Sequence, residues 1–228
     1  MIFSKKAAAF LLAAILLGGS LAPKSYAEAK AIGGRANDDM KIALTFDDGP
    51  HPRNTPKILD ILAGYGIKAT FFEVGENVEL YPEVSRRVVA EGHEIGNHTY
   101  THPHLLKTDY CSLLDEVAHC EKVITETTGV KPSFFRPPEG VVDANVRKVA
   151  EDEGYSIIVW TVDTRDWAGT SADVIVKTVL ENINSGDIIL MHDYTSKKCN
   201  TIPALRRIIP ALRDMGYEFV TVGELLSI

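Results

Sequence analysis

The chain has 228 residues, a length that is enough for one sizeable core but short for two. Its formal net charge is −7. The first 27 positions hold three lysines and no acidic residue, so 21 of the 24 basic residues remain against all 31 acidic ones, a net charge of −10. A chain this acidic gains nothing from electrostatic attraction to nucleic acid or to an anionic membrane surface, and we expect a neutral or cationic ligand.

The first 27 residues have the pattern of an export signal. Two lysines are followed by an apolar run at 7–17, and Ser25 and Ala27 place small residues where a signal peptidase reads. The apolar run is shorter than the about 20 residues that a membrane-spanning helix needs. We therefore predict a signal peptide over 1–27, cleaved near Ala27, and a secreted or extracytoplasmic protein of the cell envelope. An uncleaved N-terminal anchor is the alternative.

Residues 28–40 are polar and contain glycine, which predicts a linker or an irregular N-terminal segment. Beyond them, apolar runs typical of strands alternate with helical patterns. The expected strands are Ile42–Phe46, Thr70–Val74, Glu94–Gly96, Ser133–Phe135, Ser156–Val162, Ile188–Met191 and Phe219–Val222. The expected helices are Thr55–Tyr65, Pro82–Glu91, Asp109–Thr128, Ala144–Glu153, Ala172–Ile183 and Ile202–Met215. This alternation predicts a single α/β domain over 41–228 with a parallel sheet, either open or closed into a barrel.

The three cysteines do not form a disulfide framework. Cys111 and Cys120 lie nine positions apart in one predicted helix, about 13 Å along its axis, which is too far for a bridge. Either of them can pair with Cys199 and leave one thiol over, or all three can be incidental. We expect a monomer.

Polar side chains follow five of the predicted strands, at the point where each strand ends. Asp47 and Asp48 follow the first strand, Asn97, His98 and His102 the third, Arg136 the fourth, Asp163, Asp166 and Trp167 the fifth, and His192 and Asp193 the sixth. The carboxyl ends of parallel strands meet at one face of an α/β domain, where sites form. The sequence therefore predicts one polar site built from these side chains.

Two histidines in this set have the spacing of metal ligands. His98 and His102 stand at i and i+4, on one face of a helical turn, although such a pair alone is weak evidence. A carboxylate from the Asp47–Asp48 pair is the obvious third ligand. Two imidazoles and one carboxylate leave positions open for water and substrate, and they suit zinc first, with cobalt, nickel or iron as alternatives.

Five motifs in chain order carry a family resemblance. They are TFDDGP at Thr45–Pro50, HTYTH at His98–His102, RPPEG at Arg136–Gly140, DTRDW at Asp163–Trp167 and LMHD at Leu190–Asp193. Together they closely resemble the motifs of polysaccharide deacetylases, the NodB-like domain of carbohydrate esterase family four, over about residues 41–226. The resemblance implies a single distorted, incomplete (β/α) barrel and a metal-dependent removal of acetyl groups from N-acetylated sugars.

The resemblance also implies which residues bind the ion and which residue deprotonates the water. Asp48, His98 and His102 would bind one divalent ion, which polarises the acetyl carbonyl and acidifies a water molecule. Asp47 would be the general base that deprotonates this water. Arg136 would be the cationic hydrogen-bond donor beside that base, which favours its charged form.

The remaining roles concern the leaving group and the substrate. His192 would be the general acid, with Asp166 holding its second ring nitrogen and keeping the ring cationic. The backbone N–H of Glu139 would stabilise the oxyanion together with the ion. Leu190 and Trp167 would form the walls around the acetyl methyl group and the sugar ring, although a tryptophan is often simply a core residue.

Two features depart from the family pattern or fall outside it. The fourth position of RPPEG, often aromatic in this family, is Glu139, whose charge favours a cationic, partly deacetylated substrate or disfavours an anionic muramyl one. We also expect no separate carbohydrate-binding module, so that the cleft itself binds the polymer. Asp163 either orients Arg136 or caps its own loop, and His93, before the third strand, is predicted to be structural.

These patterns support three hypotheses about function. The first is a secreted, metal-dependent N-deacetylase acting on an N-acetylglucosamine polymer, either peptidoglycan or chitin-type oligomers. The second is an O-acetyl esterase on xylan or another acetylated glycan, which the same residues can serve. The third is a non-catalytic sugar-binding descendant, and the presence of both Asp47 and His192 argues against it, because a binding protein needs neither base nor acid.

Overall fold

The computed structural model describes residues 30–34, 39–195 and 199–227, so the predicted signal peptide at 1–27 lies outside the described residues. Within these ranges nine strands form one sheet, whose named pairings are all parallel. The strands are β1 (Ala31–Ile32), β2 (Lys41–Asp47), β3 (Thr70–Glu73), β4 (Glu94–Asn97), β5 (Phe134–Phe135), β6 (Ser156–Ile158), β7 (Val162–Asp163), β8 (Ile188–His192) and β9 (Glu218–Val220). Their order is β1-β6-β5-β4-β3-β2-β8-β7, and β9 pairs with β2.

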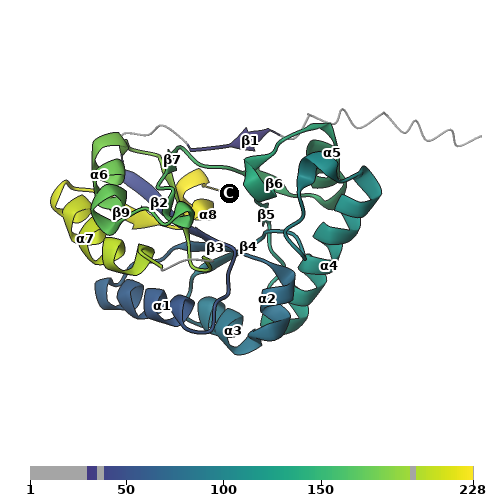
Figure 1. Cartoon of the computed structure of the whole chain (residues 1–228), viewed down its shortest axis with the longest axis horizontal. Coiled ribbons are helices and arrows are strands. Elements are labelled where there is room, and N and C mark those ends of the chain that lie inside the picture. The colour runs from purple at the N-terminus through teal and green to yellow at the C-terminus, as the bar shows by residue number, and fades with distance from the viewer. Residues whose placement is uncertain (1–29, 35–38, 196–198, 228) are drawn as a thin grey trace, which may run out of the picture.

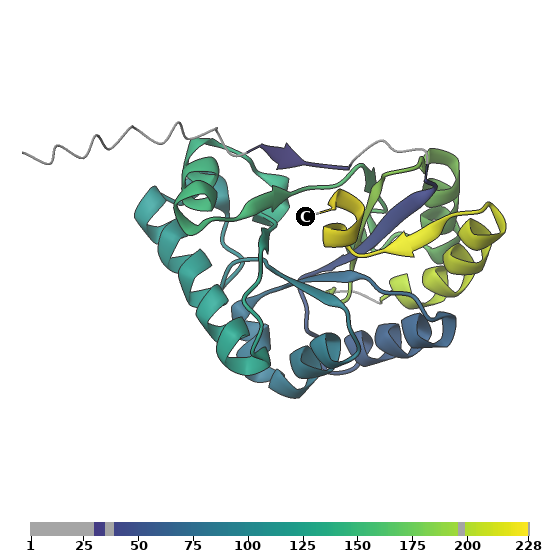
Figure 2. The ribbon, with the colours of Figure 1, turned by 180° about the vertical axis from the view of Figure 1, so that it is seen from behind.

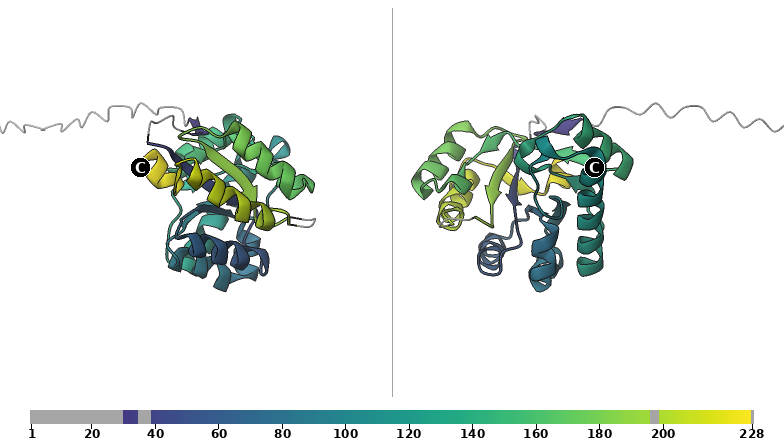
Figure 3. Two further views of the ribbon diagram at one scale, coloured as in Figure 1. Left: turned by 90° about the vertical axis from the view of Figure 1, so that its left-hand side faces the viewer. Right: turned by 45° about the vertical axis from the view of Figure 1, so that its right-hand side comes forward.

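The helices lie around the outside of this sheet. They are α1 (Asn54–Tyr65), α2 (Gly75–Leu80), α3 (Pro82–Ala90), α4 (Tyr110–Thr128), α5 (Ala144–Glu153), α6 (Ala172–Asn182), α7 (Thr201–Asp214) and α8 (Val222–Leu226), with short 3₁₀ turns at Leu105–Lys107, Pro138–Gly140 and Asp166–Ala168. Figures 1 and 2, which view opposite sides, show the helices following one another around a curled sheet, and Figure 3 shows α6 and α7 side by side. This confirms the predicted α/β class and the incomplete (β/α) barrel.

Successive side chains of β2 point alternately to the outside and to the inside of the barrel. Ile42, Leu44 and Phe46 point outward, into the core beneath α1, α6 and α7. The intervening Ala43 belongs to a second core inside the curl, together with residues of α8. Because successive side chains of a strand point to opposite faces, Thr45 and Asp47 share the inward face. Strand β2 therefore directs two polar side chains, Thr45 and Asp47, into the barrel.

Two predicted strands are wrong in extent, each for a local reason. Ser156–Val162 is expected as one strand, but it divides into β6 and β7. The main-chain oxygens of Ile158 and Val159 at the break accept hydrogen bonds from Arg136, at 3.3 and 3.1 Å, so they are drawn away from a regular ladder. At the other position, β9 ends at Val220, and Thr221 caps the helix α8, which the sequence reading missed.

Helix α8 closes the end of the barrel where the strands begin. The main-chain N–H of Val222 donates to Thr70 at 2.9 Å, and that of Gly223 donates to Glu94 at 3.1 Å. Thr70 and Glu94 are the first residues of β3 and β4. Since α8 fills this end, the opposite end, where the strands finish, is left for the site.

The segment predicted as a linker or irregular stretch contains a short strand. Ala31–Ile32 pairs with β6, and Gly34 forms an antiparallel bridge to Asp187, just before β8. These contacts connect the two sides of the incomplete barrel. The predicted domain boundaries at residues 28 and 41 stay predictions.

Two smaller expectations have clear outcomes. The three cysteines are free thiols, with Cys120 buried and Cys111 exposed, so Cys199 forms no disulfide. Among the described residues, none of the helices is long and apolar enough to cross a membrane.

Candidate active site

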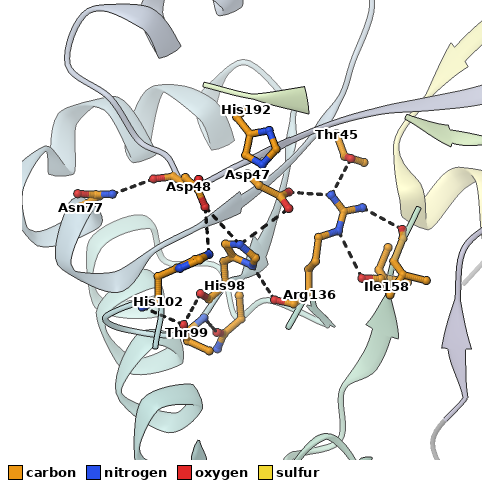
Figure 4. Close-up of polar contacts among 12 residues, drawn as sticks. Thr45, Asp47, Asp48, Asn77, His98, Thr99, His102, Arg136, Ile158 and His192 are labelled. Carbon is orange, nitrogen blue, oxygen red and sulfur yellow. Dashed lines mark hydrogen bonds and ion pairs between the residues drawn. The ribbon is translucent and has the colours of Figure 1, made fainter. Parts of the chain in front are cut away.

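The five motifs meet at the end of the barrel where the strands finish. Asp47 and His192 are the last residues of β2 and β8 and are register partners, while His98 and Arg136 immediately follow β4 and β5. Figure 4 shows these side chains converging. They surround a cavity of about 500 Å³, lined by Asp47, Asp48, His98, His102, Glu139, Trp160, Asp163, Trp167, Leu190 and His192. Of the predicted site residues, Asn97, Arg136, Asp166 and Asp193 do not line this cavity. Arg136 and Asp166 contact residues that do, namely Asp47 and His192.

Asp48, His98 and His102 form a group that fits a divalent ion. The Nε2 atoms of both histidines lie 3.4 Å from Asp48 Oδ1, and one ligand atom from each of the three residues falls within 4.8 Å of the others. Asp48 Oδ1 is buried and has no hydrogen-bond partner. A buried carboxylate oxygen left without a donor is costly, and an ion would satisfy it. The donor set and this orphaned oxygen therefore fit a metal site.

The orientation of His98 supports the same interpretation. Its Nδ1 lies 2.6 Å from the main-chain oxygen of Arg136. A carbonyl oxygen only accepts, so Nδ1 must carry the hydrogen, and the lone pair of Nε2 points towards Asp48. Metal-binding histidines are commonly oriented by such a contact through the second ring nitrogen.

The backbone at the site is held in conformations that residues other than glycine rarely adopt. Asp48, His102 and Glu139 have φ values of 73°, 56° and 58°. Each such residue costs on the order of 1–3 kcal/mol and persists only where its surroundings enforce it. Asn77 Nδ2 donates to the main-chain oxygen of Asp48 at 2.8 Å, and the His102 N–H donates to Thr99 Oγ1 at 3.2 Å (Figure 4). These backbone conformations lower the stability of the fold, and they place these side chains in the site.

The charges within this group predict how ion binding depends on pH. Burial opposes the charged form of His98, but the Asp47 and Asp48 carboxylates outweigh it and raise the pKa of His98. Burial also opposes ionisation of Asp48, yet the neighbouring imidazoles lower its pKa overall. An ion binds the neutral imidazole, so it must displace the His98 proton, and its affinity falls as the pH falls.

Asp47 and Arg136 form a fully buried ion pair beside this group. Arg136 Nη1 donates to Asp47 Oδ1 at 2.7 Å and to Thr45 Oγ1 at 2.7 Å, and the guanidinium lies 4.1 Å from the centre of the Phe72 ring. Arg136 is 0% exposed and Asp47 is 3% exposed. The second carboxylate oxygen, Asp47 Oδ2, lies 3.8 Å from His98 Nε2. One oxygen of Asp47 is therefore held by Arg136, while the other lies near the ion-binding group.

His192 and Asp166 form the second ion pair. His192 Nδ1 lies 2.7 Å from Asp166 Oδ1, and the His192 N–H donates to Asp166 Oδ2 at 2.8 Å. Burial disfavours the imidazolium, but Asp166, with Asp47 and Asp48 further away, raises the pKa of His192 to about 9. With Nδ1 held by the carboxylate, the Nε2–H of His192 is free to face the cavity. The pair thus presents a protonated imidazole at neutral pH.

The remaining predicted residues lie around the cavity mouth. Trp167 is 47% exposed, so it is not a core residue, and it also lines a neighbouring hollow of about 430 Å³. Leu190 lines the cavity from β8. Asp163 caps its own loop, because its Oδ1 accepts from the Arg165 N–H at 2.8 Å, while the Arg136 guanidinium donates to Thr45, Asp47 and two main-chain oxygens. Glu139 lies in the turn after Arg136.

Comparison with known proteins shows which family this chain belongs to. A profile of the polysaccharide deacetylase family matches residues 34–158. The chain belongs to the polysaccharide deacetylase family. A peptidoglycan-N-acetylglucosamine deacetylase of Bacillus cereus is 42% identical over 212 residues, covering 92% of this chain and 77% of that protein. A crystal structure of the Bc1960 peptidoglycan N-acetylglucosamine deacetylase superposes with a TM-score of 0.83 at 40% identity, covering 87% of this chain and 92% of that one.

One solved relative shows that this fold alone does not establish activity. A family-four pseudoenzyme from Bacillus anthracis superposes with a TM-score of 0.82 at 32% identity, covering 88% of this chain and 70% of that one. A shared fold is therefore compatible with a protein described as a pseudoenzyme. In the present polysaccharide deacetylase, Asp47 and His192 are both present, and each has its oppositely charged partner.

Three residues of this deacetylase site were missed from sequence. Thr45 accepts from Arg136, and its place two residues before Asp47 on the same strand is a signal that would have found it. Thr201 donates to Asp166 Oδ2 at 2.6 Å from the start of α7, with no sequence signal. Trp160 lies between β6 and β7 and lines the cavity. The predicted continuous strand over 156–162 gave no reason to expect it there. His93, predicted as structural, is buried and accepts from the Ala69 N–H at 3.1 Å.

Two buried carboxyl groups lie behind the deacetylase site. Asp193 is fully buried, and burial raises its pKa to about 7; Thr55 donates to one of its oxygens, and the other has no partner. A Cβ at Gly49 would lie 2.3 Å from the Asp193 carboxylate, so a larger residue at position 49 would displace this buried side chain. Glu73 is 0% exposed, accepts from Ser85 at 2.6 Å, and leaves its Oε1 unpaired.

Burial of Glu73 predicts that this deacetylase becomes less stable as the pH rises. Burial, with Asp193 adding to it, raises the pKa of Glu73 from 4.5 to about 8. Between these values unfolding releases a proton, so the free energy of unfolding falls with increasing pH. We expect Glu73→Gln, which removes this titration, to flatten the decline. Urea midpoints of both proteins, measured at matched ion saturation between about pH 5 and about pH 8, test this, and parallel curves would contradict it.

Proposed function

We propose that this protein is a secreted, metal-dependent hydrolase that removes N-acetyl groups from N-acetylglucosamine-containing polysaccharide, either peptidoglycan or chitin-type oligomers. The observation that carries the proposal is that a base and an acid, each in its own buried ion pair, adjoin one ion-binding group in one cavity. Amide hydrolysis needs this combination, because a proton must leave the attacking water and another must reach the departing nitrogen.

Asp47 is the base in this proposal. Its Oδ1 is fixed by Arg136, and the remaining oxygen faces the ion-binding group at 3.8 Å from His98 Nε2. A water molecule between Asp47 Oδ2 and the acetyl carbon gives its proton to the carboxylate as its oxygen attacks. The Arg136 charge compensates a carboxylate that would otherwise be buried alone.

His192 is the acid. The Asp166 carboxylate fixes the ring through Nδ1 and favours the imidazolium, so Nε2–H gives its proton to the amide nitrogen as the bond to the acetyl carbon breaks. The nitrogen leaves as a neutral amine and the acetyl group as acetate. An amide nitrogen is a poor leaving group without this proton, so an acid with a pKa of about 9 that is charged at neutral pH supports N- rather than O-deacetylation.

Asp48, His98 and His102 would hold the divalent ion, for which zinc is our first choice and cobalt, nickel or iron the alternatives. When bound, the ion acts as a Lewis acid on the acetyl carbonyl and lowers the pKa of its water. We propose that the Glu139 N–H adds a hydrogen bond to the developing oxyanion, and that Leu190 and Trp167 contact the acetyl methyl group and the sugar ring. Export through residues 1–27 belongs to the same proposal and is supported by their charge and apolar pattern.

The proposal is tested by measuring which products the zinc-loaded protein releases. We expect equal amounts of acetate and free amine from chitooligosaccharide or from peptidoglycan, and little acetate from acetylated xylan. Acetate without free amine would support the O-acetyl esterase instead, and binding of the sugars without either product would support the non-catalytic alternative. A protein incubated with a chelator serves as the control and is expected to release neither product.

A further inference from the structure

The cavity contains negative charge that the reaction does not use. Asp47 and Asp48 are compensated by Arg136 and by the ion-binding imidazoles, but Glu139 and Asp163 also line it. Of the described residues that line this cavity, none is a lysine or an arginine. The two additional carboxylates therefore face substrate without a fixed cationic partner in the cavity wall.

Glu139 is the better placed of the two to contact substrate. Asp163 uses its Oδ1 on the Arg165 N–H in its own loop. Glu139 instead has a side chain that is 46% exposed at the cavity edge, and its Oε1 lies 2.9 Å from Nδ1 of His104. The positive φ of 58° at Glu139 sets the direction in which this side chain leaves the backbone. The contact with His104 uses Oε1, so the second oxygen of the carboxylate, Oε2, can accept from a ligand.

We propose that Glu139 is a specificity-determining residue that favours substrates in which the unit next to the acetylated sugar carries an ammonium group. This inference rests on the proposed function. An ammonium on a neighbouring unit would pair with the Glu139 carboxylate, whereas a carboxylate there would be repelled. The preferred substrate is thus a partly deacetylated polymer, and a unit bearing a free carboxylate is disfavoured.

The enzyme's own reaction supplies such a substrate. Hydrolysis of one acetamido group consumes water and yields acetate and a primary amine, and an amine of this class takes up a proton near neutral pH. Each turnover therefore places a cation beside the remaining acetylated units. With Glu139 at the cavity edge, deacetylation of one unit favours deacetylation of its neighbour.

The test compares three N-acetylglucosamine oligomers of equal length that differ in one defined unit. This unit is N-acetylglucosamine, glucosamine or N-acetylmuramic acid, which makes the probe neutral, cationic or anionic. We measure kcat/KM per acetyl group for the zinc-loaded protein and for Glu139→Gln. Glutamine keeps the main-chain N–H and a hydrogen-bonding group for His104, so it removes the charge and leaves the turn intact.

We expect the natural protein to prefer the cationic over the neutral probe by about two- to fivefold, as for a partly exposed charge pair, and to disfavour the anionic one similarly. Glu139→Gln should abolish both differences, and about 0.5 M salt should weaken them in the natural protein. Glu181→Gln, which removes an exposed carboxylate on α6 away from the cavity, should leave them unchanged.

Two results would overturn the inference. One is a natural protein with no preference for the cationic probe; the other is an unchanged preference in Glu139→Gln. Both require that the protein releases amine, so they differ from failure of the proposed function, in which no probe yields amine at all. Comparing the same probes on both proteins also cancels the effect of the size of the lactyl group of N-acetylmuramic acid, because only the charge at position 139 differs.

Discussion

Asp47→Asn is expected to lower the rate of amine release by about 10²- to 10⁴-fold, the usual contribution of a general base, while ion binding is retained. Asparagine has nearly the same shape and its oxygen still accepts from Arg136, but its amide cannot take a proton from water. Asp47 is not among the three residues of the ion-binding group. Elemental analysis for zinc after dialysis, together with amine release on chitooligosaccharide, measures both effects on one sample.

Retained zinc also answers the main objection to this variant. Removing the Asp47 charge leaves Arg136 buried without its counter-ion, which generally costs about 3–5 kcal/mol of stability. A variant that still binds zinc stoichiometrically has kept its site, so its loss of activity belongs to the chemistry. Normal turnover by Asp47→Asn would show that the base is another group.

His98→Ala is the matched control and is expected to lose both zinc and turnover. It removes one of the two imidazoles that lie 3.4 Å from Asp48 Oδ1. The two variants therefore separate ion binding from proton transfer. Zinc retained at full stoichiometry in His98→Ala would contradict the assigned ligand set.

The strand and helix alternation was largely predictable because this sheet is buried on both sides. Buried parallel strands appear as short, nearly continuous apolar runs, and β2, with six of its seven residues buried, is such a run. Helix ends were equally clear, since Gly66, Gly129 and Gly154 adopt the left-handed cap conformation that glycine allows. What local pattern did not predict depends on distant contacts. At the break between β6 and β7 a main-chain oxygen accepts from the distant Arg136, and α8 donates to the beginnings of β3 and β4.

Asp47 and Asp48 illustrate what the sequence could and could not say about the site. Adjacent residues of a strand point to opposite faces, so two neighbouring carboxylates should not share a cavity. They do so here because β2 ends at Asp47 and Asp48 turns away at φ 73°. The motif identified both residues as functional, but only the backbone explains how both reach one cavity. Gly49, with no Cβ beside the buried Asp193, is part of that turn.

The second large effect concerns His192. The substitution His192→Ala is expected to lower kcat by about 10²- to 10⁴-fold. The informative variant is Asp166→Asn. Asp166 is the main group that raises the pKa of His192 to about 9, against burial, which lowers it. A general acid must be protonated, so activity is present below this pKa and is lost as the pH rises through it.

In Asp166→Asn the alkaline limb of kcat against pH should therefore move from about pH 9 towards the ordinary imidazole value of 6.5. Thr201→Val is the control: it removes a donor to Asp166 Oδ2 but leaves the bond between Asp166 Oδ1 and His192 Nδ1. This control should keep the limb near pH 9. If Asp166 served only to support the fold, Asp166→Asn would lower activity equally at every pH and leave the limb in place. A uniform loss would thus show that Asp166 does not set the pKa of the acid, whereas a displaced limb identifies the ion pair as the source of the acid.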